Sequence, residues 1–241
     1  MKANHLDYYR YQAEARQIHT AVDVAEVARQ KSYLYDQIVL PRLKSRQGQR
    51  IVEAACGHGS FLYWLQNRGF DKILGVDSST EQTALAQSAG LNIETTEINQ
   101  WLDAQQSESI HVIVGIDLIE HLPKDDLVAF LQNSHRVLQK GGLLILRYPN
   151  GDSPLVGMNL FNDITHIWTY TTTAMRSLSE MCGYANAEFN DESAAAIRDH
   201  RWLKVPLCKF SQKILGALFQ AATREKIGFW SPHIWVFLTK K

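Results

Sequence analysis

The sequence predicts an α/β protein built on a mostly parallel sheet, and three observations support this. Short apolar runs alternate with helical stretches from Gln49 onward. Glycines follow the first of these runs, and an acidic residue ends the second. With 241 residues, the chain is long enough to bury one substantial core. Because alternating strands and helices form parallel sheets with right-handed crossovers, we expect one such domain with additions.

The predicted elements divide the chain into a helical N-terminal cap, residues 1–48, and a main domain, residues 49–241. Strands are predicted over residues 51–55, 73–76, 91–93, 110–116, 143–148, 184–189 and 234–238. Helices are predicted over residues 60–68, 79–89, 124–139 and 171–182, with a helical lid or insertion over 193–228. We interpret Lys140-Gly141-Gly142 as the signal that stops the third of these helices.

Charge balance and cysteine content indicate which partners and which cellular compartment to expect. The 25 Lys and Arg residues balance the 25 Asp and Glu residues, so the chain lacks the basic excess that favours nucleic-acid binding. We therefore expect no nucleic-acid partner. Three widely separated cysteines, Cys56, Cys182 and Cys208, form neither a metal-binding pair nor a disulfide framework. This usage indicates the reducing cytoplasm.

A glycine turn follows the first predicted strand. Gly57 and Gly59 lack Cβ atoms, so the backbone can turn sharply there and a ligand can lie against it. The next helix begins at this turn and presents free N–H groups to the carboxylate of an amino-acid-like ligand. Glu53, just before the turn, suits a cationic or amino-bearing ligand. Taken alone, the pattern is equally consistent with a simple tight turn.

Asp77 ends the second predicted strand and favours the ligand-binding interpretation. A carboxylate at this place can accept both ribose hydroxyls of a nucleoside. A dinucleotide such as NAD is the natural competitor. Its phosphate loop needs a third glycine, and Leu62 stands at that position.

These residues together resemble class I methyltransferases, which use S-adenosylmethionine and have a Rossmann-like sheet of seven strands. Glu53, Ala55, Gly57 and Gly59 match the family pattern acid-x-Gly-x-Gly-x-Gly, with Ala55 in place of the first glycine. We expect the backbone of Ala55 to keep an ordinary conformation. Residues 117–123 and 136–143 resemble the fourth strand, the helix after it and the fifth strand of the family.

The resemblance also implies roles for other residues around the cofactor. Asp77 and the adjacent Ser78 correspond to the ribose site, and Asn99 falls where the family has an acid or amide near the adenine. Asp117 is expected to line the methionine end of the cofactor.

The loop after the fifth predicted strand points to the methyl acceptor. Residues 149–154 and 163–166 resemble the Pro-Asn-x-x-Ser-Pro and Asp-x-Thr-His segments of bacterial methyltransferases from surface-polysaccharide gene clusters. The resemblance implies O-methylation of a sugar hydroxyl. His166 is then the candidate general base, with Asp163 orienting its ring. Alternatively, both side chains only hold the loop in shape.

Asp117, Glu120 and His121 permit a metal-binding interpretation, since an acid, an acid and a histidine could bind Mg²⁺ or Zn²⁺. Some quinone-type O-methyltransferases use a similar segment in this way. Many metal-free relatives share the Glu-His pair, so we expect no metal here. A metal would favour the alternative function, O-methylation of a phenolic or quinone-like molecule. A third alternative is a non-catalytic interaction module.

Residues 198–222 combine apolar and basic side chains in a pattern typical of an amphipathic helix. We favour a lid helix that packs on the sheet or on a partner subunit. The other interpretation is peripheral contact with the inner membrane, which would suit an acceptor on a lipid carrier. The sequence leaves the oligomeric state open.

Overall fold

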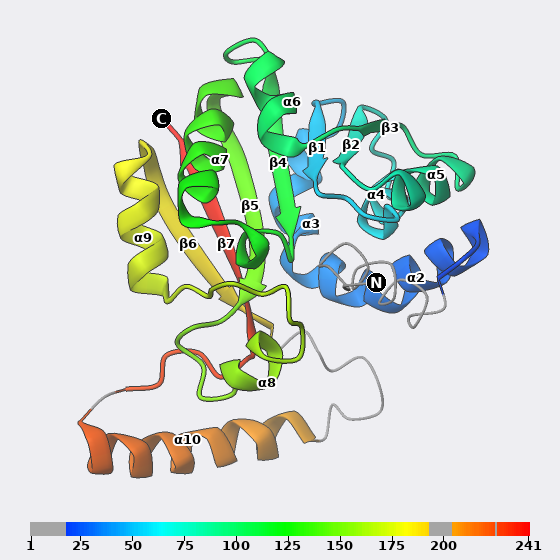
Figure 1. Ribbon diagram of the computed structural model, residues 1–241. Helices are drawn as coiled ribbons and strands as arrows, with labels where there is room; N and C mark the ends of the chain where they lie inside the picture. Colours follow the sequence, from blue (N-terminus) through cyan, green and yellow to red (C-terminus); the bar gives the residue numbers. More distant parts are fainter. Residues whose placement is uncertain (1–17, 193–203, 225) are drawn as a thin grey trace, which may run out of the picture.

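A seven-stranded sheet forms the centre of the protein in the computed structural model, which describes residues 18–192, 204–224 and 226–241 (Figure 1). The strand order is β3-β2-β1-β4-β5-β7-β6. The strands are β1 (Ile51–Ala54), β2 (Ile73–Asp77), β3 (Ile93–Thr95), β4 (Ile110–Ile116), β5 (Leu138–Pro149), β6 (Tyr184–Asp191) and β7 (His233–Lys240). The predicted cap residues 1–17 and insertion residues 193–203 lie outside the described residues.

Strand direction confirms the predicted fold class. The first five strands are parallel to their neighbours, and β7 runs antiparallel between β5 and β6. The strand order reverses direction between β1 and β4, because β2 and β3 continue to one side and β5 to the other. In open parallel sheets, ligands bind outside the carboxyl ends of the strands at such a switch point. The fold therefore places residues that follow β1, β2 and β4 at one edge.

Helices cover both faces of the sheet (Figure 1). Buried side chains of one face pack against α6 (Ile98–Ala104), α7 (Lys124–Val137) and α9 (Thr172–Met181). The other face packs against α2 (Ala21–Ile38), α3 (Leu40–Leu43), α4 (Ser60–Asn67) and α5 (Thr80–Ser88). Short helical turns occur at η1 (Lys44–Arg46), η2 (Ile119–His121) and α8 (Val156–Leu160).

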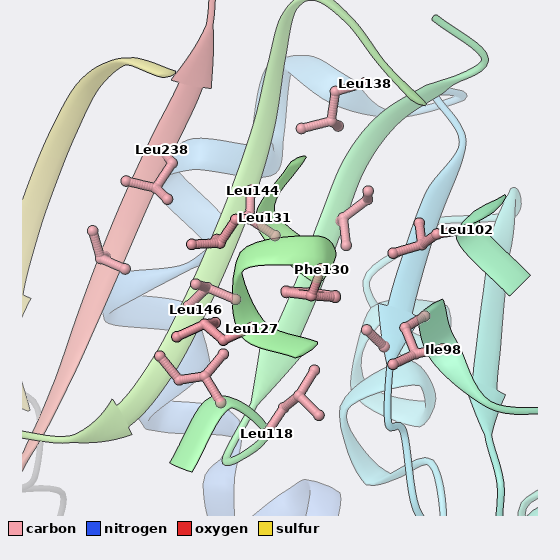
Figure 2. Packing of buried hydrophobic residues seen from close by; sticks show 14 of the residues in the cluster. Ile98, Leu102, Leu118, Leu127, Phe130, Leu131, Leu138, Leu144, Leu146 and Leu238 are labelled. Carbon is pink, nitrogen blue, oxygen red and sulfur yellow. The ribbon is translucent and has the colours of Figure 1, made fainter. Parts of the chain in front are cut away.

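Among the helices, α7 contributes the most buried side chains to the apolar layer that it shares with α6 and α9 (Figure 2). Leu127, Phe130 and Leu131 recur at helical spacing and are almost fully buried. They lie over Leu144 and Leu146, which point from β5 to the same face. Burying each of these side chains contributes roughly 1.5–3 kcal/mol, so this layer fixes β4 and β5 relative to the helix.

An aromatic cluster holds α2 on the opposite face. The Tyr35 ring lies 5.0 Å from Phe61 and 5.2 Å from Trp64, both on α4. The Trp64 indole donates a 3.1 Å hydrogen bond to Asp36, which also forms an ion pair with Arg68. The N-terminal helix is therefore packed against the element that follows the glycine turn.

The structure corrects the predicted boundary at Lys140-Gly141-Gly142. Helix α7 ends at Val137, and these three residues belong to β5. Leu138 pairs with Ile110, after which the register shifts by a bulge. Gly141 has a φ of +72°, so the glycine pair marks an irregular strand and not a helix end. The third strand starts two residues later than predicted, and α6 was not predicted.

Helix α10 (Lys204–Thr223) lies apart from the sheet at the bottom of Figure 1. Of residues 206–223, all but Gln212 and Gly216 are exposed. The structure contradicts one part of our expectation, a lid packed on the sheet, whereas packing on a partner subunit stays a prediction. The apolar side chains that would have packed on the sheet point to solvent. No helix in the described part of the chain is long and apolar enough to cross a membrane.

Candidate active site

The turn after β1 has three residues in the left-handed region of backbone conformation. Ala55, Gly57 and Gly59 have φ values of 53°, 52° and 77°. The two glycines serve different purposes. A Cβ on Gly59 would lie 2.5 Å from the Leu91 side chain, so this glycine allows α4 to pack closely. A Cβ on Gly57 would come within 4 Å only of the Gln82 side-chain oxygen, which leaves its outer side open to a ligand.

Ala55 does not keep the ordinary conformation that we expected. Its φ of 53° is costly for a residue with a Cβ atom, by roughly 1–2 kcal/mol. Asp117, at the end of the neighbouring strand β4, has the same φ. Strained residues of this kind cluster at functional sites. The neighbouring strands β1 and β4 thus each end in a residue with a strained backbone.

Asp77 holds the glycine turn from the end of β2. Its Oδ2 accepts a hydrogen bond of 2.7 Å from the Gly57 N–H, and its Oδ1 accepts one of 2.8 Å from the Ser79 N–H. Carboxylate oxygens can each accept further hydrogen bonds. The carboxylate is therefore oriented by the backbone and keeps capacity for hydroxyl donors.

Glu53 lies on β1 just before this turn. It is buried, and its Oε2 has no hydrogen-bond partner among the described residues. Burial raises the pKa of this carboxyl well above its usual value, and the Lys31 ammonium opposes that rise. An unpaired buried carboxylate is costly, so this position is suited to a cationic partner.

Two other predicted cofactor residues lie at the margin of this group. Ser78 is exposed directly after Asp77, while its neighbour Ser79 caps α5. The Asn99 amide, near the start of α6, donates a 3.2 Å hydrogen bond to the Asp126 carbonyl. The Asn99 Oδ1 is buried with no partner among the described residues, so the acceptor end of this amide stays available.

Asp117 lies in an ion-pair network that the sequence analysis missed. Arg147 on β5 forms ion pairs with Asp117 and with Glu192. Glu192 also accepts a 2.7 Å hydrogen bond from the Trp235 indole. Although burial raises the pKa of Asp117, Arg147 holds it below its usual value. Burial and Arg147 lower the pKa of His233, beside this network, to about 4.

The loop after β5 is tied to the same edge of the sheet. The Asn150 amide donates a 2.9 Å hydrogen bond to the Ser231 carbonyl, and Asp152 accepts one of 2.7 Å from the Thr172 N–H. Further along, the Ile167 N–H donates a 2.8 Å hydrogen bond to the Glu120 carbonyl. This last bond brings His166 next to the segment that follows β4.

The structure corrects the role predicted for Asp163. The His166 Nδ1 lies 3.0 Å from the Asn159 carbonyl oxygen and 3.1 Å from that of Leu160. Because carbonyl oxygens only accept, Nδ1 carries the proton, and these two carbonyls orient the ring. Asp163 instead accepts hydrogen bonds from the Thr165 N–H and hydroxyl. Asp163 therefore stabilises the loop and does not position the histidine ring.

His166 and His121 face one another, with ring centroids 4.7 Å apart. Burial and the nearby His166 lower the pKa of His121, which favours its neutral form. Glu120 is 1% exposed and lies beside both rings. The metal set considered from the sequence contained Asp117, but Asp117 is ion-paired with Arg147 and is absent from this cluster.

Comparison with known protein families decides the class. A family model described as a methyltransferase domain matches residues 27–188, more than half of the 241-residue chain. The chain belongs to this family. It therefore carries a domain of the class that transfers a methyl group.

The methyltransferase has a curated relative of low identity. It is 22% identical over 176 residues to tRNA U34 carboxymethyltransferase from Hydrogenovibrio crunogenus (strain DSM 25203 / XCL-2). The aligned part covers 68% of this chain and 52% of that protein. The chain thus spans about half the length of this relative.

Solved structures share the fold of the methyltransferase. A SAM-dependent methyltransferase from Archaeoglobus fulgidus superposes with a TM-score of 0.64 at 16% identity, over 85% of this chain and 94% of that one. Phosphoethanolamine N-methyltransferase 2 from Haemonchus contortus, in complex with S-adenosyl-L-methionine, gives a TM-score of 0.57 at 14% identity, over 95% and 59%. At these identities the likeness concerns the fold alone.

The residues at this edge of the sheet fit S-adenosylmethionine as a cofactor. S-adenosylmethionine carries a sulfonium and an ammonium group, and the unpaired Glu53 oxygen offers a negative partner at the turn. The open side of Gly57 lets a ligand approach the backbone, and Asp77 can accept from ribose hydroxyls. Arg147 could have been suspected from the sequence, because a charge inside the apolar segment Leu143–Tyr148 needs a buried partner.

Proposed function

We propose that the methyltransferase methylates a hydroxyl group of a saccharide in bacterial surface glycan synthesis. One observation carries the proposal: the loop after β5 brings His166 to Glu120 and His121, three residues after Asp117. A neutral hydroxyl must lose its proton at or after methyl transfer, and this group of side chains can receive it. The resemblance of the same loop to polysaccharide-cluster methyltransferases supports a sugar as the acceptor.

We propose the following arrangement of the cofactor. The backbone at Gly57 and Gly59 contacts the amino-acid part, and Glu53 faces its positive groups. Asp77, with Ser78 beside it, binds the ribose. Asn99 lies toward the adenine, and Asp117 lines the methionine end. This arrangement points the methyl group toward the side of the sheet where the loop after β5 lies.

His166 is the residue that we propose to handle the acceptor proton. Its Nδ1 is held by two backbone carbonyls, so Nε2 carries the lone pair that can take a proton. The transferred methyl forms a bond to the acceptor oxygen as its bond to sulfur breaks. The electron pair of that bond stays on sulfur and leaves S-adenosylhomocysteine.

A second candidate acceptor is a phenolic or quinone-like molecule. Large apolar side chains of the same loop favour it, since Phe161 and Ile164 are 81% and 76% exposed, and Trp168 is 48% exposed. An aromatic acceptor could pack against them. The tRNA-modifying relative raises RNA as another class, but equal numbers of basic and acidic residues speak against it. The retained Glu53, Gly57, Gly59 and Asp77 speak against a non-catalytic module.

The exposed helix α10 bears on the location of the acceptor. Its apolar side chains Leu207, Ile214 and Leu218 are 64%, 47% and 63% exposed, and residues 204–224 contain no acidic residue. We propose a cytoplasmic enzyme whose helix can rest on an anionic membrane surface, where lipid-linked glycans lie.

An acceptor screen tests the proposal. Purified enzyme with labelled S-adenosylmethionine would be offered nucleotide sugars, lipid-linked glycans, phenols and quinones, and transfer RNA. We expect label in a saccharide, coupled to release of S-adenosylhomocysteine. Label only in a phenol or quinone would establish the second candidate, and label only in RNA would overturn both.

A further inference from the structure

Three metal-ligand atoms converge beside the cofactor edge. One carboxylate oxygen of Glu120 and one ring nitrogen each of His121 and His166 lie within 4.8 Å of one another. Glu120 and His121 belong to the turn η2, while His166 comes from a loop 45 residues later. The set therefore does not arise from a single helix or a local sequence repeat.

Glu120 is the first sign that this cluster is built for a ligand. The residue is 1% exposed, and its Oε2 is buried with no hydrogen-bond partner among the described residues. Burial, with a smaller effect of the nearby Asp117, raises the pKa of this carboxyl well above its usual value. A buried carboxylate with an unused oxygen is costly unless it is neutralised or paired. A cation at this place would remove the cost.

The orientation of the two imidazoles is the second sign. The Nδ1 atom of His166 faces the carbonyl oxygens of Asn159 and Leu160, at 3.0 and 3.1 Å. The Nδ1 atom of His121 faces the Thr165 carbonyl at 3.3 Å and its hydroxyl at 3.0 Å. Metal-binding histidines characteristically donate one ring N–H to such a carbonyl, which fixes the ring and leaves Nε2 as the ligand.

The backbone holds the two halves of the cluster together. The Glu120 carbonyl accepts hydrogen bonds from the Ile167 N–H at 2.8 Å and from the Trp168 N–H at 3.4 Å. Asp163 braces Thr165, which in turn contacts His121. The segment with Glu120 and His121 is thus joined to the segment with His166 by main-chain hydrogen bonds and not only by side-chain contacts.

We propose that Glu120, His121 and His166 bind one divalent transition-metal ion of the Zn²⁺ class. Two imidazoles and one carboxylate suit Zn²⁺ and related ions, whereas Mg²⁺ prefers oxygen ligands. With metal–ligand distances of about 2.0–2.2 Å, tetrahedral geometry places ligand atoms about 3.4 Å apart, so the three side chains close inward on binding. This set leaves at least one coordination position open.

The site goes beyond the proposed function, because it stands on ligand geometry and not on the identity of the acceptor. It also departs from our sequence expectation of no metal, since the sequence did not bring His166 to Glu120. Metal binding would occupy the His166 Nε2 lone pair, so His166 could not also take the acceptor proton as the proposed function assigns. In the metal-loaded enzyme the metal would take over that role by lowering the pKa of an acceptor hydroxyl at the open position. Its proton would then leave to solvent.

Direct binding measurements test the site without any acceptor. Untagged enzyme, treated with EDTA and dialysed, would be titrated with Zn²⁺ by calorimetry and with Co²⁺ by visible absorption. We expect one ion per chain, Co²⁺ bands typical of nitrogen and oxygen ligands, and much weaker binding of Mg²⁺. Glu120→Gln, His121→Ala and His166→Ala should each weaken Zn²⁺ binding by at least tenfold.

The exposed His19 supplies the matched control, since His19→Ala should leave Zn²⁺ binding unchanged. Unchanged affinity for S-adenosylhomocysteine would show that each variant is folded. Absence of stoichiometric Zn²⁺ binding, or binding that the three variants do not weaken, would overturn the site. A negative acceptor screen with intact Zn²⁺ binding would instead count only against the proposed function.

Discussion

The proposed cofactor side and the proposed acceptor side of this methyltransferase are built in different ways. On the cofactor side, short-range backbone geometry does the positioning: Gly57, Gly59 and Asp77 lie at the ends of two consecutive strands, and the Gly57 N–H donates a hydrogen bond to the Asp77 carboxylate. On the acceptor side, the loop after β5 must travel back to η2 before His166 meets Glu120. The first kind of site can be found in a sequence motif, whereas the second needs the fold.

The two sides share one feature of buried charge. Asp117 is compensated by Arg147, which holds its pKa low, while Glu120 keeps an unused oxygen three residues later. Glu53 has the equivalent oxygen without a hydrogen-bond partner, its Oε2, on the cofactor side. Each side thus has one buried carboxylate whose partner is expected to come from a bound molecule or ion. The predictions below test this division, beginning with the largest expected effect.

Replacing His166 should have the largest effect, and it should lower turnover without weakening cofactor binding. His166→Ala should lower turnover roughly 10²–10⁴-fold, the range for loss of a general base. Affinity for S-adenosylhomocysteine should stay near that of the wild type, because the ring faces the acceptor side. Steady-state kinetics and calorimetry would measure both. His166→Asn keeps hydrogen bonding without basicity. If this variant retained most of the activity, the histidine would only hold the loop in shape.

Replacing Arg147 should destabilise the protein, because it removes the cation that Asp117 and Glu192 share. Arg147→Met leaves the carboxylates of Asp117 and Glu192 without their cation, and the free energy of unfolding should fall by roughly 3–5 kcal/mol. Denaturant unfolding would measure this. Replacing Arg29, whose ion pair with Glu26 is exposed, by Met should lower the free energy of unfolding far less. Equal losses in the two variants would contradict a buried network.

The same network predicts how stability depends on pH. Arg147 depresses the folded-state pKa of Asp117. The stabilisation from this group is therefore present above the unfolded pKa of about 3.9 and is lost as pH falls through the lower folded value. Unfolding midpoints measured between pH 7 and pH 3 should fall in the wild type. Asp117→Asn should show a shallower fall, and parallel curves would exclude this contribution.

The smallest expected effect concerns strain on the cofactor side. Ala55→Gly removes a Cβ from a residue at a φ of 53°, and it should stabilise the protein by up to about 1 kcal/mol. Thermal unfolding would detect the gain. Ala54→Gly is the control, because Ala54 lies buried in β1, where glycine should destabilise. A loss in both variants would show that Ala55 is not strained.

Much of the fold could be predicted, because over residues 49–149 the spacing of apolar residues and the positions of the turn-forming residues indicate the same elements. Apolar strands, the glycine turn and Asp77 were all visible in the sequence, and the alternation of strands with helices predicted the mostly parallel sheet. The bulge at Gly141 could not be distinguished from a helix end, since glycine serves both conformations. The short helix α6 was not predicted, because it follows closely on a strand of only three residues.

The acceptor side shows where sequence reasoning stops. His166 was found from a local motif, but its ring partners are the backbone carbonyls of residues 159 and 160, which no side-chain pattern reveals. Asp163 was placed on the histidine by spacing, although in the structure it bonds to Thr165. Contacts of the Glu120–His166 kind depend on how a long loop returns, and that is decided by the whole sheet.

Calorimetric titration with S-adenosylhomocysteine tests the central claim, that the cofactor binds across the carboxyl ends of β1 and β2. We predict one binding site in the wild type. Asp77→Ala removes a charged acceptor of the ribose hydroxyls and should weaken binding by about tenfold or more, or roughly 1.5–3 kcal/mol. The exposed Asp71, which lies just before β2, provides the control, and Asp71→Ala should bind as the wild type does. Equal affinity of Asp77→Ala and the wild type would contradict the account.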